Sequence, residues 1–157
     1  MERGEVTLNY YKLMDKCIEL AENTSNEMYN LHTGSLIWLD GEIVAEGWKT
    51  FIEPTKMTMH AERHALDRIV GRASLSEAYL FTTLEPCVPN RSRRNTIFHS
   101  CCEYIVKSGI GNVVIGQKDD SPIVNGSSGI KYLESNKEIA KTCYPQGKPQ
   151  SIYRKFF

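Results

Sequence analysis

The feature that most restricts the fold is a predicted β-hairpin near the start of the chain. Two strand-like runs, residues 34–39 and 42–48, flank the dipeptide Asp40-Gly41. An Asp-Gly pair between apolar runs is typical of a two-residue hairpin turn, because both turn positions need a positive φ. The hairpin predicts an antiparallel strand pair.

Helix-like and strand-like segments alternate after this hairpin. Alternation of this kind is typical of βαβ units with parallel strands. A helix that starts near Leu8 and closes between Asn23 and Asn30 precedes the hairpin. The later segments are a helix over about 60–70, a strand over 78–84, a helix over 101–108 that stops at Gly109, a strand over 112–116, a short helix near Tyr132 and a weak strand over 139–143. This order predicts a three-layer α/β/α sandwich around a five-stranded mixed sheet.

Length and charge limit the domain count and the function classes. The 157 residues, 41% of them hydrophobic, fit a single domain over 1–157 with residues 144–157 as a C-terminal tail. Nineteen basic residues balance nineteen acidic ones, so no overall field attracts nucleic acid or a membrane surface. No apolar run approaches the roughly 20 residues of a membrane span. Since no secretory signal is visible either, we expect a cytoplasmic protein.

One histidine, one glutamate and two cysteines fall where a metal site can form. His60 and Glu62 lie at the start of a predicted helix, Cys87 follows a predicted strand, and Cys101 begins the next helix. The N-terminus of a helix favours a thiolate. One imidazole and two thiolates leave the fourth tetrahedral position of Zn²⁺ open, as in catalytic zinc sites, where the metal activates a water molecule. Glu62 would then move protons as general base and acid.

The same residues also fit interpretations without a catalytic metal. Cys102, next to Cys101, is the alternative ligand, and it or His99 could complete a purely structural zinc site. The cysteines could also be ordinary buried residues beside a surface histidine. An odd count of five cysteines argues against a disulfide framework.

His60-Ala-Glu62, followed by Pro86-Cys87 and a second cysteine, resembles the signature of the zinc-dependent cytidine and deoxycytidylate deaminase superfamily. Leu84-Glu-Pro-Cys87 and the widened, arginine-bearing gap after it are most similar to the deaminase domain of riboflavin-biosynthesis deaminase–reductases. The usual gap between the cysteines is two residues, whereas residues 88–100 separate them here. Counting back from Gly109 at the family's spacing lands on Cys101.

The resemblance implies a cytidine-deaminase-like fold and a set of substrate contacts. We expect Asn30 and Ala61 to contact the substrate, Asn30 because the family places a substrate-binding asparagine before its first strand. Arg91 and Arg94 lie in the loop between two predicted ligands, where guanidinium groups could bind a substrate phosphate. Pro89 stands where this branch normally has a histidine, which leaves the exact substrate open.

These residues predict a hydrolytic deaminase that releases ammonia from an aminopyrimidine nucleotide, as in the riboflavin pathway. One alternative is a deaminase of another free nucleobase, nucleoside or nucleotide, of the cytidine, dCMP or guanine type. Others are a nucleic-acid-editing deaminase and a non-catalytic zinc-binding module. Nucleic acid is the less favoured partner because the charge is balanced. The resemblance also implies a homo-oligomer, a dimer or tetramer.

Overall fold

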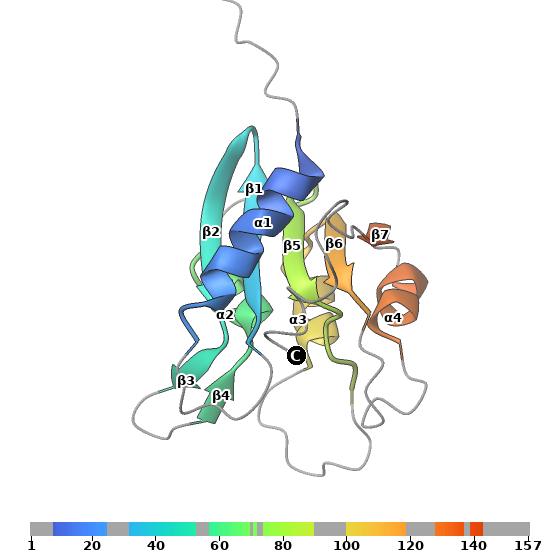
Figure 1. Cartoon of the computed structure of the whole chain (residues 1–157). Coiled ribbons are helices and arrows are strands. Elements are labelled where there is room, and N and C mark those ends of the chain that lie inside the picture. Colours follow the sequence, from blue (N-terminus) through green and yellow to red (C-terminus); the bar gives the residue numbers. More distant parts are fainter. Residues whose placement is uncertain are drawn as a thin grey trace, which may run out of the picture.

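A five-stranded mixed sheet with helices on both faces forms the fold (Figure 1). The computed structural model describes residues 8–24, 32–52, 57–69, 71, 74–89, 100–118, 128–136 and, for the backbone alone, 139–142. The predicted tail over 144–157 lies outside these residues. The three-layer α/β/α prediction and the predicted strand number are confirmed.

The sheet has the strand order β2-β1-β5-β6-β7. Its strands are β1 (Gly34–Leu39), β2 (Glu42–Trp48), β5 (Tyr79–Leu84), β6 (Asn112–Gln117) and β7 (Ile139–Thr142). β1 pairs antiparallel with both β2 and β5, whereas β6 pairs parallel with β5 and β7. The carboxyl ends of three neighbouring strands therefore meet at one edge, where open α/β sheets place their sites.

The turn between β1 and β2 has the backbone that the Asp-Gly pair predicts. Asp40 and Gly41 have φ values of 51° and 84°, both in the left-handed region that this turn requires. The pairing register shifts between Ile37 and Trp38 of β1, which face Ala45 and Ile43 of β2. The extra residue is therefore Val44, and the bulge in β2 adds local twist to the hairpin.

One helix covers one face of the sheet, and three shorter helices cover the other (Figure 1). The single helix is α1 (Tyr10–Ala21), capped by Asn9, whose side chain accepts a hydrogen bond from the backbone of Lys12. The other three are α2 (Ala61–Asp67), α3 (Cys101–Ser108) and α4 (Gly129–Ser135). Ser100 caps α3, and Gly109 ends it at a φ of 77°, as the sequence predicts.

Two apolar clusters hold these layers together. On the α1 face, buried side chains of the helix meet those of the sheet: Met14, Cys17, Leu20, Leu36, Phe81 and Val114. On the opposite face, residues of α2, α3 and α4 pack on the sheet; they include Ala65, Leu66, Ile105, Leu133, Ile37, Leu80, Val113 and Ile115. Alternate residues of β1, β5 and β6 thus enter opposite clusters.

Two features differ from the sequence prediction. Helix α1 ends at Ala21, before the predicted closing region. The strands β3 (Thr50–Ile52) and β4 (Met57–Met59), which are not among the strands that the sequence predicts, form a separate antiparallel ribbon. Their side chains are exposed or half-buried, and such short, exposed runs show little of the periodicity that predicts a strand.

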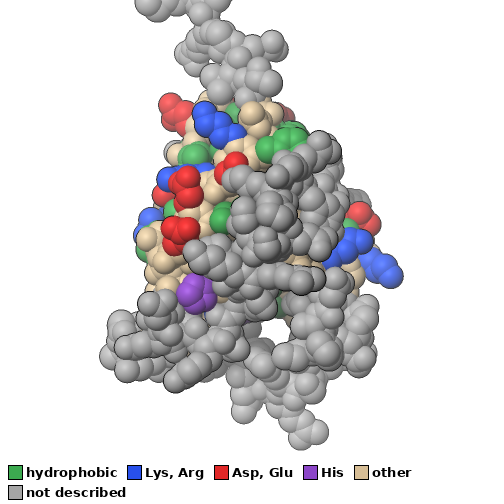
Figure 2. Space-filling view, in the orientation of Figure 1, with side chains coloured by type: hydrophobic (Ala, Val, Ile, Leu, Met, Phe, Trp, Pro, Cys, Tyr) green, Lys and Arg blue, Asp and Glu red, His purple; other side chains and the backbone are tan. Residues whose placement is uncertain are grey.

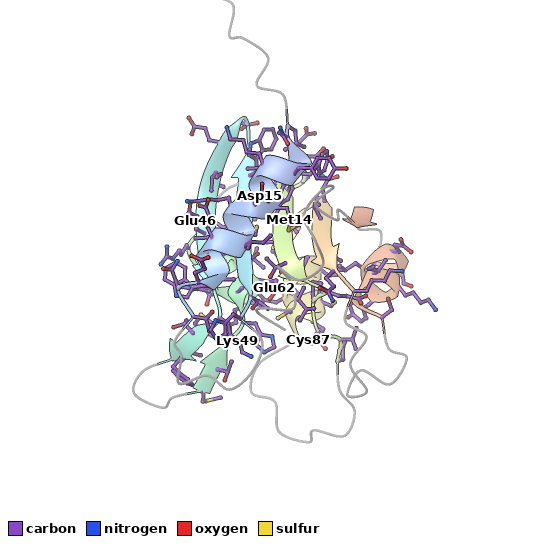
Figure 3. The ribbon with its side chains drawn as sticks, in the orientation of Figure 1. Met14, Asp15, Glu46, Lys49, Glu62 and Cys87 are labelled. Atoms are coloured by element: carbon purple, nitrogen blue, oxygen red, sulfur yellow. The ribbon has the colours of Figure 1, made fainter. Side chains whose placement is uncertain are left out.

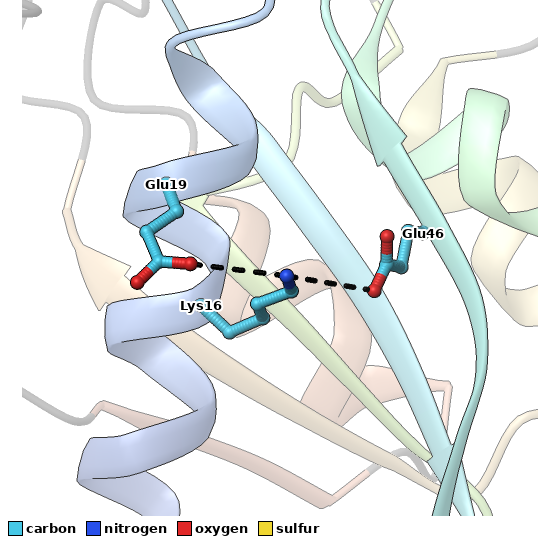
Figure 4. A network of polar contacts seen from close by, with 3 residues as sticks. All are labelled: Lys16, Glu19 and Glu46. Carbon is cyan, nitrogen blue, oxygen red and sulfur yellow. Dashed lines mark ion pairs between the residues drawn. The ribbon is translucent and has the colours of Figure 1, made fainter.

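Charged side chains of both signs lie side by side on the surface seen in Figure 2. Lys16 on α1 lies between Glu19 and Glu46, with nitrogen–oxygen distances of 3.8 and 4.0 Å (Figure 4). Solvent-exposed pairs at such distances add little stability. Among the described residues, no helix has the length and apolar character to cross a membrane.

Gly47 lets α2 approach β2 closely. A Cβ atom at this position would lie 2.4 Å from the carbonyl oxygen of Ala61 and 2.5 Å from the amide nitrogen of Ala65. Both contacts are with the helix backbone, so a side chain here would push the helix away from the strand.

We therefore predict that Gly47→Ala lowers the free energy of unfolding by about 1–3 kcal/mol, the usual cost of overpacking. Chemical denaturation checks this. Glu46→Ala, at the adjacent position, is the matched control and should change stability by less than about 1 kcal/mol. Unchanged stability of Gly47→Ala would contradict this close helix–strand contact.

Candidate metal centre and substrate pocket

Three sequence-predicted side chains meet beyond the carboxyl end of β5. His60 is the N-cap residue of α2, Cys87 follows β5 through Glu85-Pro86, and Cys101 is the first residue of α3. Figure 3 shows Cys87 near Glu62 and Lys49 at the lower end of the sheet. The fold thus brings together two helix N-termini and one strand end.

The donor atoms of the three side chains are close enough to bind one ion. The Nδ1 atom of His60 lies 3.2 Å from Cys101 Sγ and 3.7 Å from Cys87 Sγ. All three donor atoms lie within 4.8 Å of one another. His60 makes no side-chain capping hydrogen bond to α2. Its imidazole is directed toward the two sulfur atoms instead.

The start of α3 stabilises negative charge on Cys87. The backbone N–H of Cys101 donates to Cys87 Sγ at 3.2 Å, as expected for an anion at a helix N-terminus. Hydrogen bonds, first from the Cys101 thiol and then from His60, lower the pKa of Cys87 to about 4. The bond to Cys87 and burial raise the pKa of Cys101. These opposite directions favour a thiolate at Cys87 and a thiol at Cys101.

This donor set fits zinc. Imidazole nitrogen and cysteine sulfur are common zinc ligands, and three of them leave one tetrahedral position for water or substrate. Metal binding would release a thiol proton, because thiolates are the ligand form. The described residues contain no other group of three histidine, cysteine or acidic side chains with this spacing.

Glu62 lies in the first turn of α2, two residues after His60, and its side chain is 4% exposed. The hydroxyl of Thr82 donates a hydrogen bond to Glu62 Oε1 at 2.7 Å. A buried carboxylate needs such a donor because burial removes its water. The sequence does not indicate this role of Thr82, since one threonine within a strand carries no motif.

A pocket of about 140 Å³ adjoins these residues. It is lined by Thr33, Lys49, His60, Glu62, Leu84, Glu85 and Cys87. Burial lowers the pKa of Lys49, while the charge of Glu62 acts in the opposite direction. Lys49 and Thr33 were also missed from sequence, because they precede the motifs and reach the site only through the fold. The pocket thus combines one cation with two carboxylates.

The predicted substrate contacts are only partly within the described residues. Asn30, Arg91 and Arg94 lie outside them. Ala61 is fully buried, and its carbonyl lies against Gly47. Ala61 is not among the described residues that line the pocket.

Glu85 connects the end of β5 to α4. Its side chain is 7% exposed, and Oε2 accepts hydrogen bonds from the Ser128 hydroxyl and the Ile130 backbone, both at 2.9 Å. The carboxylate therefore holds the first turn of α4 against the segment that carries Cys87.

Cys102, the alternative ligand, and His64 of α2 have structural contacts. Cys102 directs its thiol toward the carbonyl oxygens of Pro86 and Gly129, at 3.4 and 3.8 Å, and burial raises its pKa. The Nδ1 atom of His64 lies 3.1 Å from the backbone nitrogen and 3.0 Å from the carbonyl oxygen of Trp48, and burial lowers the pKa of His64. Cys102 and His64 therefore hold elements together.

Comparison with known families gives a match over most of the chain. The family described as the cytidine and deoxycytidylate deaminase zinc-binding region matches residues 8–117. This span includes the three donor residues and Glu62. This match confirms the enzyme class and the zinc cofactor that the sequence predicts.

Two curated relatives show how far the similarity extends. A diaminohydroxyphosphoribosylamino-pyrimidine deaminase of Buchnera aphidicola is 34% identical over 143 residues, which are 90% of this chain and 87% of that protein. The riboflavin biosynthesis protein RibD of Escherichia coli is 34% identical over 74% of this chain. The match spans only 29% of the Escherichia coli protein.

Solved structures have the same fold. A diaminohydroxyphosphoribosylaminopyrimidine deaminase/reductase from Thermotoga maritima has a TM-score of 0.71 and 27% identity, with 94% of this chain and 40% of that chain covered. The dCMP deaminase of cyanophage S-TIM5 has a TM-score of 0.64 and 19% identity, over 85% of this chain and 96% of that chain. Because the identity to the cyanophage enzyme is only 19%, this similarity shows a shared fold and nothing about function.

We predict that the purified protein binds about one zinc ion per chain, as a single three-donor site implies. Cys101→Ala should lose most of the metal, because it removes one of three ligands. Cys102→Ala is the matched control and should keep it, because that thiol faces two carbonyl oxygens. Elemental analysis after gel filtration checks both variants. Zinc loss in Cys102→Ala with retention in Cys101→Ala would contradict this assignment.

Proposed function

The chain belongs to the zinc-binding cytidine and deoxycytidylate deaminase family, and we propose that it deaminates an aminopyrimidine nucleotide by hydrolysis. The observation that carries this proposal is the His60, Cys87 and Cys101 cluster beside a buried glutamate in one pocket. The relatives named for diaminohydroxyphosphoribosylaminopyrimidine deamination support the substrate class. In the reaction, water replaces the ring amino group, a carbonyl forms and ammonia leaves.

We assign the metal to His60 Nδ1 and the sulfur atoms of Cys87 and Cys101. When bound, zinc supplies Lewis-acid activation of the attacking water. The protein contributes the positions of the ligands: His60 is placed by the start of α2, and the two cysteines are placed by the end of β5 and the start of α3. The arrangement needs no movement of a whole element to bring the donors together.

Glu62 moves the protons in this mechanism. Its carboxylate first takes a proton from the attacking water and passes it to the ring nitrogen. It then carries the second proton of that water to the departing amine, so that ammonia leaves as a neutral molecule. The burial of Glu62 beside His60 supports this role, because a general base must lie within hydrogen-bond reach of the proton that it transfers.

Lys49 is a further candidate for substrate contact. Its ammonium is the cation that lines the pocket beside Glu62, and it could bind a ring carbonyl or a phosphate oxygen. We also propose that Arg91 and Arg94 bind the phosphate of a nucleotide, because their loop joins two of the proposed ligands.

Asn30 and Ala61 remain predicted substrate contacts. The expected dimer or tetramer and the expected cytoplasmic location also remain predictions.

Two alternative functions of the same pocket would act on different substrates. A cytidine, dCMP or guanine deaminase would use the same zinc and glutamate chemistry on another ring. An editing deaminase would need a basic surface that follows a nucleic-acid backbone, whereas charges of both signs are interspersed on the surface in Figure 2. A panel of substrates distinguishes these readings.

We predict that the zinc-loaded protein releases ammonia fastest from a phosphorylated diaminohydroxypyrimidine ribosylamine, and more slowly from its unphosphorylated analogue. Glu62→Gln should keep the zinc and the fold but lose about 100- to 10,000-fold in turnover for each proton-transfer role. An ammonia assay with cytidine, dCMP, guanine and single-stranded DNA as further substrates checks both statements. Near wild-type turnover by Glu62→Gln would contradict the mechanism, and preference for another panel member would contradict the substrate.

A further inference from the structure

The carboxylate of Glu62 is held by a side chain from the centre of the sheet. Thr82 is fully buried on β5 and faces α2, with its Oγ1 atom 2.7 Å from Glu62 Oε1. In the sheet register, Thr82 lies opposite Ser35 of β1 and Ile115 of β6. A strand paired on both sides offers a rigid base for a hydrogen-bond donor.

We propose that Thr82 is a positioning residue that orients the Glu62 carboxylate for proton transfer. This inference rests on the proposed function. The Thr82 hydroxyl has one proton to donate, and its second acceptor, the Leu84 carbonyl, is more distant at 3.3 Å. An ionised carboxylate is an acceptor only. The hydroxyl therefore donates to Glu62, in a charge-assisted bond that is stronger than one between neutral groups.

The bond has a clear consequence for catalysis. A glutamate side chain has three rotatable bonds, and α2, which carries Glu62, has only seven residues. Fixing Oε1 on Thr82 removes most of this freedom and leaves Oε2 to serve the water and the ring nitrogen. A misplaced general base slows the catalysed reaction even when its own pKa and charge are unchanged.

Thr83, the next residue, provides a matched control. It is also buried, but successive side chains of a strand point to opposite faces. Its hydroxyl accepts a hydrogen bond from the Gly34 backbone at 3.2 Å, on the strand β1. Removal of the Thr83 hydroxyl should lower the melting temperature without affecting Glu62.

The first test measures kcat and KM of Thr82→Val, Thr82→Ser and Thr83→Val in the zinc-loaded enzyme. Thr82→Val should lower kcat by about 10- to 150-fold, the equivalent of one hydrogen bond to a charged group, with little change in KM or in zinc content. Thr82→Ser keeps the hydroxyl and should recover most of kcat. Thr83→Val should keep the wild-type kcat.

The second test is a double-mutant cycle on unfolding, with Thr82→Val, Glu62→Ala and both together in zinc-loaded protein. The two changes should be non-additive, because each removes the same contact. Additive effects, a wild-type kcat in Thr82→Val, or an equal loss in Thr82→Ser would each overturn the role of Thr82. Absence of ammonia release by the wild type from every panel compound would instead overturn the proposed function, while the unfolding cycle would still report on the contact.

Discussion

The site depends on how firmly the turn after β5 is held. Glu85 donates its backbone N–H to the Gln117 carbonyl at 2.8 Å, and its carboxylate binds the start of α4. The Cys87 carbonyl accepts from the Cys102 backbone at 3.0 Å, and Cys87 Sγ accepts from the Cys101 backbone. Strand β6 and helices α3 and α4 thus all contact the turn. Because buried backbone groups need partners, a shift of this turn would break several hydrogen bonds at once.

This anchoring explains how residues far apart in the sequence can form one centre. His60 begins a helix that lies directly on β2 at Gly47, and Cys101 begins a helix that is bonded to the turn itself. Glu62 then reaches the same pocket from the first turn of α2, where Thr82 of β5 meets it. The proposed site residues thus lie at the ends of regular elements, as a preorganised site requires. The family's zinc-dependent deamination follows from this arrangement.

Much of this structure could be predicted because local signals matched the fold. Asp40-Gly41 predicts the hairpin turn, and Gly109 predicts the end of α3. The sequence also predicts that Cys87 lies at the end of a strand and Cys101 at the start of a helix. The β3–β4 ribbon could not be predicted, because its short strands bury little surface. The contacts of Lys49 and Thr82 depend on which strands and helices become neighbours. A single sequence does not contain that information in any local pattern.

The central claim is that one nitrogen and two sulfur atoms of this chain hold a zinc ion and leave a position open. X-ray absorption spectroscopy at the zinc edge of the loaded protein tests it most directly. We predict two sulfur neighbours at about 2.3 Å and nitrogen or oxygen neighbours at about 2.0–2.1 Å, of which one is imidazole. Three or four sulfur neighbours, or a shell without sulfur, would contradict the assignment of His60, Cys87 and Cys101.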